Sequence, residues 1–321
     1  SPWSWTVGVL VAAFQPIFGF TSAGAQSDAL LFCASALLFF AVARGFARGL
    51  TPQTSALLGS AVGLGVVSKI NFLGLVPGAA LAAAVLALRA VRQAGRFPTR
   101  AVTVGLLLAV APILLYVTLN VAVWDRPWWA QSLQGQTSEA LAGRAGGVKT
   151  SLFQQLGYIW QLYLPKLPFM FDQFDYFPPY DTWWTSWIGV FGWVDYEFRA
   201  WVYVVALGIF GAVALCAAAA LYPARETLKS RAPEVLCLAA LASGLLVELG
   251  LFGIRYREST GLDFEQGRYL VPLLPLYAVL PALAVRGVGA RLSRPVGAVI
   301  VVAAMGHSVF AMLLTLSRFY G

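Results

Sequence analysis

Three charged residues stand at positions where a charge is costly in a mostly apolar chain: Asp28, Lys69 and Arg268. Each borders or enters a long hydrophobic run, and a charge at membrane depth costs about 2.5–3.5 kcal/mol on insertion scales. The planar guanidinium of an arginine suits a phosphate or a carboxylate, and a lysine adds a second positive charge. This pattern indicates an anion-binding site, and we predict that all three side chains line one cavity.

Each of these residues also has a purely structural interpretation. Asp28 opens a hydrophobic run, where its carboxylate would cap a helix N-terminus. The Lys69 side chain would extend to lipid headgroups. The Arg268 guanidinium would pair with an acidic neighbour, and the candidates are Asp263, Glu265 and Glu258. Both interpretations stay open at this point.

Further candidates for substrate binding surround Arg268 or lie in the aromatic stretch before it. Arg268 belongs to GLDFEQGRYLVPLLPLY, whose prolines predict an irregular helix entry. Gln266 is its near neighbour, and Arg257 would raise the local positive potential. Aromatic faces can stack on sugar rings, although interface anchoring is the alternative for any single ring. The candidates from that stretch are Trp184, Trp193 and Asp195.

Two other polar residues interrupt hydrophobic runs. Glu248 lies late in its run, and the interpretation is a structural hydrogen bond or an internal partner. His307 is the single histidine and has no second histidine or cysteine close in sequence. It is therefore predicted to be a packing residue, and no metal site is predicted from it.

Composition identifies an integral membrane protein. Hydrophobic residues make up 59% of the 321 residues and charged residues 11%, against about 25% charged in soluble domains. The net charge of +8 does not indicate nucleic-acid binding, because the basic residues fall mainly in short gaps between apolar runs. Nine apolar runs predict an all-α bundle of about nine transmembrane helices. The runs are 5–20, 28–43, 55–68, 72–88, 101–123, 200–221, 234–252, 269–285 and 295–316.

The placement of arginine and lysine predicts the orientation. Four short gaps are basic, and the positive-inside rule makes them cytoplasmic. They contain Arg44 and Arg48; Arg89, Arg92, Arg96 and Arg100; Arg225, Lys229 and Arg231; and Arg286, Arg291 and Arg294. The opposite face receives the long aromatic stretch, in which short interfacial helices are expected. The predicted organisation is N-terminal helices in 1–123, an extracytoplasmic aromatic loop in 124–199 and C-terminal helices in 200–321.

The third and fourth runs are short and are joined by a corner at Ser68–Asn71. We predict that they form a tight hairpin. Gly59 and Gly63 lie in its first arm, four residues apart. Glycines at this spacing allow a neighbouring helix backbone to approach closely.

The segments TWWTSWIGVFGWVDYEFRAWVY and EQGRYLVPLLPL resemble the C-terminal half of the bacterial domain of unknown function family 2142, which is grouped with GT-C glycosyltransferases. GFTSAGAQSDALLFCASALLFF and AVGLGVVSKINFLGLVPG are similar to other parts of that superfamily. The resemblance implies transfer of a sugar from a polyprenyl-phosphate donor to a glycan, lipid or protein acceptor at the outer face of the bacterial inner membrane. It implies that Arg268 and Lys69 hold the lipid phosphate and that Asp28 orients a substrate or a divalent cation, Mg²⁺ or Mn²⁺.

One feature departs from the GT-C pattern. The resemblance implies a catalytic carboxylate in the first outer loop, but no acidic residue precedes Asp28. The interpretation is that the main base lies upstream of Ser1 in a longer protein. Two rival functions are a lipid or oligosaccharide transporter or flippase and a non-catalytic subunit of a membrane envelope complex. The predicted partners are membrane lipids, the sugar donor, its acceptor and another membrane protein, with no nucleic acid.

Overall fold

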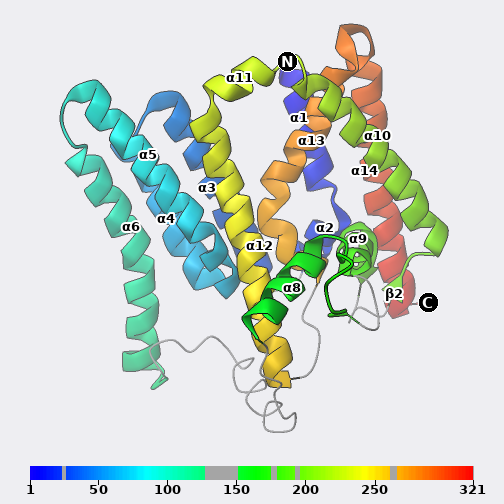
Figure 1. The fold of residues 1–321 in the computed structure, drawn as a ribbon, viewed down its shortest axis with the longest axis horizontal. Helices are drawn as coiled ribbons and strands as arrows, with labels where there is room; N and C mark the ends of the chain where they lie inside the picture. Colours follow the sequence, from blue (N-terminus) through cyan, green and yellow to red (C-terminus); the bar gives the residue numbers. More distant parts are fainter. Residues whose placement is uncertain (24–26, 127–150, 175–178, 192–195, 261–265, 321) are drawn as a thin grey trace. The chain divides into compact units, whose positions relative to one another are not determined.

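The computed structural model describes residues 1–23, 27–126, 151–174, 179–191, 196–260 and 266–320 (Figure 1). Within these ranges, seven helical segments are long and apolar enough to cross a membrane. This confirms the predicted all-α membrane protein. The segments are Ser27–Arg48, Ile70–Ala94, Thr99–Val123, Ala200–Leu221, Ala232–Glu258, Gly267–Gly287 and Gly289–Arg318.

All nine predicted hydrophobic runs are helical in the described residues. Two of them form helices too short to be included among the seven spans. The first run is divided into α1 (Pro2–Ala13) and α2 (Pro16–Ala23), and the third forms α4 (Pro52–Ser68). The number of membrane crossings therefore stays a prediction.

The chain folds into two compact units, each assembled from separate stretches of sequence. Unit 1 contains 1–32, 181–235 and 266–321, and unit 2 contains 33–180 and 236–265. The predicted division at residues 123 and 199 follows membrane topology rather than packing, and it stays a prediction.

Unit 1 is built around α1 and the last two long helices of the chain. Val7 and Val11 of α1 form a buried cluster with Val285, and the indole Nε1 of Trp3 donates to the Ser293 carbonyl at 3.0 Å. The N-terminus thus lies at the same end as the basic gap around Arg291. The other elements are α9 (Pro179–Gly189), β1 (Val190–Phe191), β2 (Tyr196–Glu197), α10 (Ala200–Leu221), α11 (Arg225–Ser230), η3 (Gly267–Leu273), α13 (Leu274–Gly287) and α14 (Gly289–Tyr320).

The two short strands form an antiparallel hairpin, with Val190 opposite Glu197. Beside it, Ile188, Phe198 and Tyr203 make a second buried cluster. The Tyr203 hydroxyl donates to the Gly189 carbonyl at 2.9 Å and accepts from the Phe198 amide at 3.1 Å. These bonds fix the end of α9 against the start of α10.

Unit 2 contains most of α3 (Ser27–Arg48), the hairpin, and most of α12 (Ala232–Thr260). The hairpin consists of α4, the 3₁₀ segment η1 (Ile70–Leu75) and α5 (Val76–Ala94). The remaining elements are α6 (Thr99–Thr118), the π-helical turn η2 (Leu119–Val123) and α8 (Leu152–Tyr163).

The basic gaps of unit 2 lie at one end of it. The Arg44 guanidinium donates to the Gln53 side chain at 3.1 Å, and the Arg89 guanidinium lies 4.7 Å from the centre of the Phe46 ring. Because these contacts join the end of α3 to both arms of the hairpin, the η1 corner lies at the opposite end. This arrangement agrees with the predicted topology for these two gaps.

The prediction of close packing at Gly59 and Gly63 is confirmed. A Cβ atom added to Gly59 would overlap the carbonyl of Gly105 in α6, and one added to Gly63 would lie 2.7 Å from the Leu108 carbonyl oxygen. These two overlaps would arise because the backbones of α4 and α6 are in direct contact. Figure 1 shows the two helices side by side.

Candidate functional site

The backbone break at η3 carries Arg268, and it is fixed by α9. The Gly267 amide donates to the buried Ser186 hydroxyl at 2.9 Å. A Cβ atom at Gly267 would lie 2.7 Å from that oxygen and 3.0 Å from the Trp187 amide nitrogen. Only glycine permits this approach without a shift, so α9 and the start of η3 are held in direct contact.

The same end of α9 is also tied to the break between α1 and α2. The Gln15 side chain is 5% exposed, and its amide nitrogen donates to the Trp187 carbonyl at 2.5 Å. The Trp187 ring meets the Tyr277 ring edge-on at 5.2 Å between centroids. Three non-helical or terminal segments of unit 1 therefore converge next to Arg268.

Arg268 has an incompletely satisfied guanidinium. Among the described residues, its buried Nε has no hydrogen-bond partner. The guanidinium carbon lies 5.5 Å from the centre of the neighbouring Tyr269 ring. Burying a donor without a partner costs about 1–3 kcal/mol, and an anion that accepts from this guanidinium would remove part of that cost.

The other predicted site residues of unit 1 differ in their burial and in their contacts. Asp28 is 2% exposed in the first turn of α3 and is already engaged in an interaction. Gln266 is the extended residue just before η3, half-buried. Trp184 is also half-buried and packs edge-on against Phe210 at 5.7 Å. Its contact is a structural one, so sugar stacking stays a prediction.

In unit 2, the hairpin corner and α12 bring polar groups together. Lys69 is the extended residue between α4 and η1, and it is engaged in an interaction. Asn71 is 2% exposed, and its amide nitrogen has no hydrogen-bond partner in the part of the chain that the structure describes. In α12, Glu248 has two buried carboxylate oxygens with no partner among the described residues. Glu248 was predicted to make an internal bond, and no such bond is present there.

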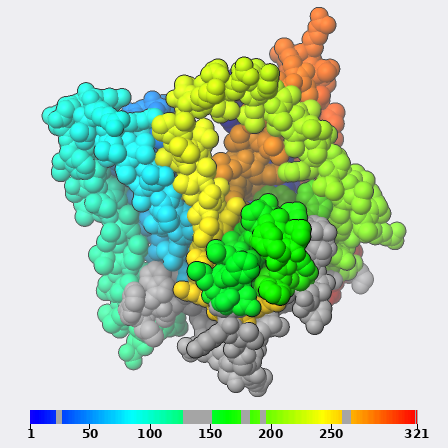
Figure 2. Space-filling model, viewed as in Figure 1, coloured from blue at the N-terminus to red at the C-terminus, as the bar shows by residue number. Residues whose placement is uncertain are grey.

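α8 crosses α12 at the same level as Glu248. The Tyr163 hydroxyl donates to the Leu246 carbonyl at 2.8 Å, and a Cβ atom on Gly250 would lie 2.8 Å from the Ile159 side chain. Leu152, Phe153 and Leu156, in the first half of α8, are between 56% and 73% exposed. Figure 2 shows α8 on the surface of the unit in front of α12. An exposed apolar face on a short amphipathic helix is typical of an interfacial helix.

An apolar pocket of about 420 Å³ lies along α8. Ile159 and Tyr163, which touch α12, are also part of its wall. The full lining is Phe153, Leu156, Gly157, Ile159, Trp160, Tyr163, Leu164 and Met170. Its size and composition suit part of an alkyl chain.

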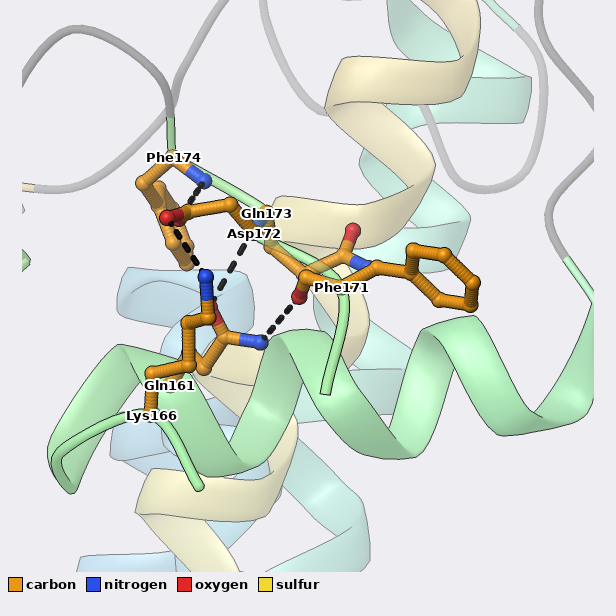
Figure 3. Close-up of polar contacts among 6 residues, drawn as sticks. All are labelled: Gln161, Lys166, Phe171, Asp172, Gln173 and Phe174. Atoms are coloured by element: carbon orange, nitrogen blue, oxygen red, sulfur yellow. Dashed lines mark hydrogen bonds and ion pairs between the residues drawn. The ribbon is translucent and has the colours of Figure 1, made fainter. Parts of the chain in front are cut away.

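The chain after α8 folds back over the helix (Figure 3). The Gln161 side chain donates to the Phe171 carbonyl at 2.7 Å and accepts from the Gln173 amide at 3.2 Å. The Arg257 guanidinium donates to the Gln173 carbonyl and lies 5.7 Å from the Phe174 ring centre. Arg257 thus fastens this segment to α12, and its predicted role in substrate binding stays a prediction.

The Lys166–Asp172 ion pair closes the same segment at 3.0 Å. The hydrogen bond from Lys166, followed by that from the Phe174 amide, lowers the pKa of Asp172 from its usual 3.8. A lowered folded-state pKa stabilises the fold above 3.8, and this contribution disappears as the pH falls through the lowered value.

We expect Asp172→Asn to lower the melting temperature slightly at neutral pH, with the difference vanishing in acid. Thermal unfolding of both proteins across this range measures it, and an equal difference at every pH would contradict it.

A family model described as a predicted membrane protein family, DUF2142, matches residues 2–277. The chain belongs to this family. No curated protein and no solved structure matches the chain. The family match supports the membrane assignment, and the functional assignment of this DUF2142 protein must come from the residues themselves.

The predicted site residues of the DUF2142 protein divide between the units. Asp28, Gln266, Arg268 and Trp184 belong to unit 1, and Lys69 and Arg257 belong to unit 2. The shared cavity of Asp28, Lys69 and Arg268 therefore stays a prediction. Trp193 and Asp195 lie outside the described residues, as do Asp263 and Glu265, two of the acids considered as partners for Arg268.

His307 packs against Phe198, with ring centroids 5.9 Å apart. Within the described ranges, no three His, Cys, Asp or Glu side chains gather in a way that could hold a metal ion. The divalent cation, Mg²⁺ or Mn²⁺, stays a prediction.

Three polar residues of these sites were missed in the sequence: Gln15, Ser186 and Asn71. Asn71 gave the clearest signal, because it is an amide in the corner of an apolar hairpin, two residues after Lys69. Gln15 and Ser186 act through partners 172 and 81 residues away, respectively. Their local sequence gives no indication of those partners.

Proposed function

We propose that this DUF2142 protein is a membrane glycosyltransferase. It transfers a sugar from a polyprenyl-phosphate donor to a hydroxyl group of a glycan, lipid or protein acceptor at the extracytoplasmic face of the bacterial inner membrane. Arg268 would bind the phosphate of the donor.

The observation that carries the proposal is the incomplete hydrogen bonding of the Arg268 guanidinium. Its guanidinium stands at the entry of a membrane helix with a buried Nε that lacks a partner among the described residues. The surrounding backbone is held by the Ser186–Gly267 bond. A positive, pre-oriented donor group of this kind is suited to a phosphate at the membrane boundary.

The chemistry follows from where charge develops. The acceptor oxygen attacks the anomeric carbon and forms the new glycosidic bond, while the bond from that carbon to the phosphate oxygen breaks. The phosphate gains negative charge as it leaves, and Arg268 stabilises that charge. Asp28 would orient a substrate, and the proton of the acceptor hydroxyl passes to a general base.

The orientation is supported within unit 1. Trp3 is bonded to Ser293 at the basic end, and η3 stands at the other end of α13. The positive-inside rule assigns the basic end to the cytoplasm. Arg268 would therefore face the extracytoplasmic side, where lipid-linked sugars are available as donors.

The test uses the full chain in liposomes with a radiolabelled polyprenyl-phosphate sugar and a membrane-lipid extract as acceptor. We expect label to move to the acceptor with release of one polyprenyl phosphate per sugar. Movement of intact donor between leaflets, without cleavage, would instead identify a flippase. If neither process occurs, the enzyme proposal fails and the non-catalytic subunit is favoured.

A further inference from the structure

The hairpin corner packs directly on one turn of α12. A Cβ atom on Gly74 would lie 2.6 Å from the Leu245 Cα and 2.9 Å from the Glu248 Cβ. One helical turn deeper, a Cβ atom on Gly78 would lie 2.7 Å from the Leu241 Cα. The hairpin arm and α12 are therefore antiparallel here, because a step of four residues forward from Gly74 to Gly78 corresponds to a step of four residues back from Leu245 to Leu241.

This register places Asn71 level with Glu248. η1 is a 3₁₀ helix, in which residues three apart are eclipsed and separated by about 6 Å. Asn71 therefore points in the same direction as Gly74, toward α12. A distance of about 6 Å corresponds to one turn of an α-helix, which leads from Leu245 to residues 248–249.

Among the described residues, Asn71 has a hydrogen-bond donor without an acceptor, and Glu248 has acceptors without a donor. Asn71 is 2% exposed, and its amide nitrogen is a buried donor with no partner within the described ranges. The Glu248 carboxylate oxygens are buried acceptors without a partner among the described residues. Neither side chain bonds the other, and each unmet group costs about 1–3 kcal/mol. A third group that both accepts from the amide and donates to the carboxylate would satisfy both.

A hydroxyl group has both properties, since it carries one donor and two acceptor lone pairs. A cation would bind the carboxylate, but the partial positive charge of the amide N–H groups would repel it. A simple ester or alkyl chain would offer no donor. The pair therefore favours a ligand with hydroxyl groups.

α8 contacts the opposite face of α12. Leu246 and Gly250, which Tyr163 and Ile159 contact, point about 180° away from Glu248 around the helix axis. The apolar pocket along α8 is therefore not beside the Asn71–Glu248 pair. The choice of a membrane amphiphile rests on the lipid-linked donor of the proposed function.

We propose that Asn71 and Glu248 form a hydroxyl-binding site for the sugar headgroup of a membrane amphiphile. The identification of the headgroup as a sugar rests on the proposed function. The pairing of the two side chains rests on the geometry of unit 2 alone.

Labelling with dicyclohexylcarbodiimide tests the site in the full chain, purified into phospholipid nanodiscs. The carboxylic O–H of Glu248 adds across one C=N bond, and the acyl group then moves to nitrogen, leaving a stable N-acylurea that is found by peptide mass spectrometry. We expect octyl glucoside, below its micelle concentration, to protect Glu248 from labelling. Octyldimethylamine oxide, which has the same tail but no hydroxyl group, should not protect it.

Asn71→Asp keeps the shape of the side chain and removes the amide donor. It should raise the glucoside concentration needed for half-protection about tenfold, as expected for one lost hydrogen bond. Glu248→Gln, which has no carboxyl group, must give no adduct at this position and serves as the control for the labelling site.

Three outcomes would overturn the proposal. Failure to label Glu248 without glucoside would mean that protein covers the carboxyl group. Unchanged labelling with glucoside would mean that water alone bridges the pair, and equal protection by the amine oxide would show that the headgroup is irrelevant. Because binding is measured without transfer, these results are independent of the glycosyltransferase test.

Discussion

Arg268→Ala should reduce the rate of sugar transfer by about 10²–10³-fold, the usual cost of removing one preorganised group that stabilises developing charge. The loss should appear mainly in kcat, because the phosphate carries more negative charge in the transition state than in the bound donor. The measurement is the initial rate of transfer from a radiolabelled polyprenyl-phosphate sugar at saturating donor. Arg268→Lys should recover only part of the rate, since a lysine keeps the charge but loses the planar fork.

Arg199→Ala is the matched control for this experiment. Arg199 precedes α10 in unit 1 and is exposed, so its removal should leave transfer and stability nearly unchanged. The Arg268→Ala protein should elute as the parent does in size-exclusion chromatography. Transfer at the parent rate by a folded Arg268→Ala protein would exclude the residue from the mechanism.

The sequence predicted the membrane fold because a bilayer constrains it strongly. A spanning helix needs about 20 apolar residues, and irregular backbone exposed to lipid is not tolerated. These rules alone located all nine helical runs. They also identified Gly59 and Gly63, since small residues four apart in an apolar helix have few purposes other than close packing.

The details of the candidate sites could not be predicted in the same way. The Ser186–Gly267 and Gln15–Trp187 bonds join residues that only the folded chain brings together. Glu248 was recognised as costly, but a sequence cannot show that its turn of α12 faces the hairpin corner. That information depends on the register at Gly74 and Gly78, which side-chain packing decides. Arg257 was predicted to bind substrate, which stays a prediction, and the sequence did not indicate the bond from its guanidinium to the Gln173 carbonyl.

Packing between helix backbones in unit 2 leads to a sharp stability prediction. Gly59→Ala would place a methyl group against the Gly105 carbonyl, and neither backbone has a flexible part that can move aside. Overpacking of this kind costs about 1–3 kcal/mol, and we expect the upper end of that range. The measurement is the free energy of unfolding in mixed micelles titrated with a denaturing detergent.

Two glycines make this prediction specific to contact rather than to glycine itself. A Cβ atom on Gly105 would lie 3.2 Å from the Ser55 carbonyl oxygen, so Gly105→Ala should cost less than Gly59→Ala. Gly208 in α10 has nothing within 4 Å of an added Cβ. Gly208→Ala should therefore stabilise the protein by up to about 1 kcal/mol, because alanine loses less conformational freedom in a helix. Opposite signs at Gly59 and Gly208 are the required result, and a neutral or stabilising Gly59→Ala would mean that α4 and α6 do not meet through their backbones.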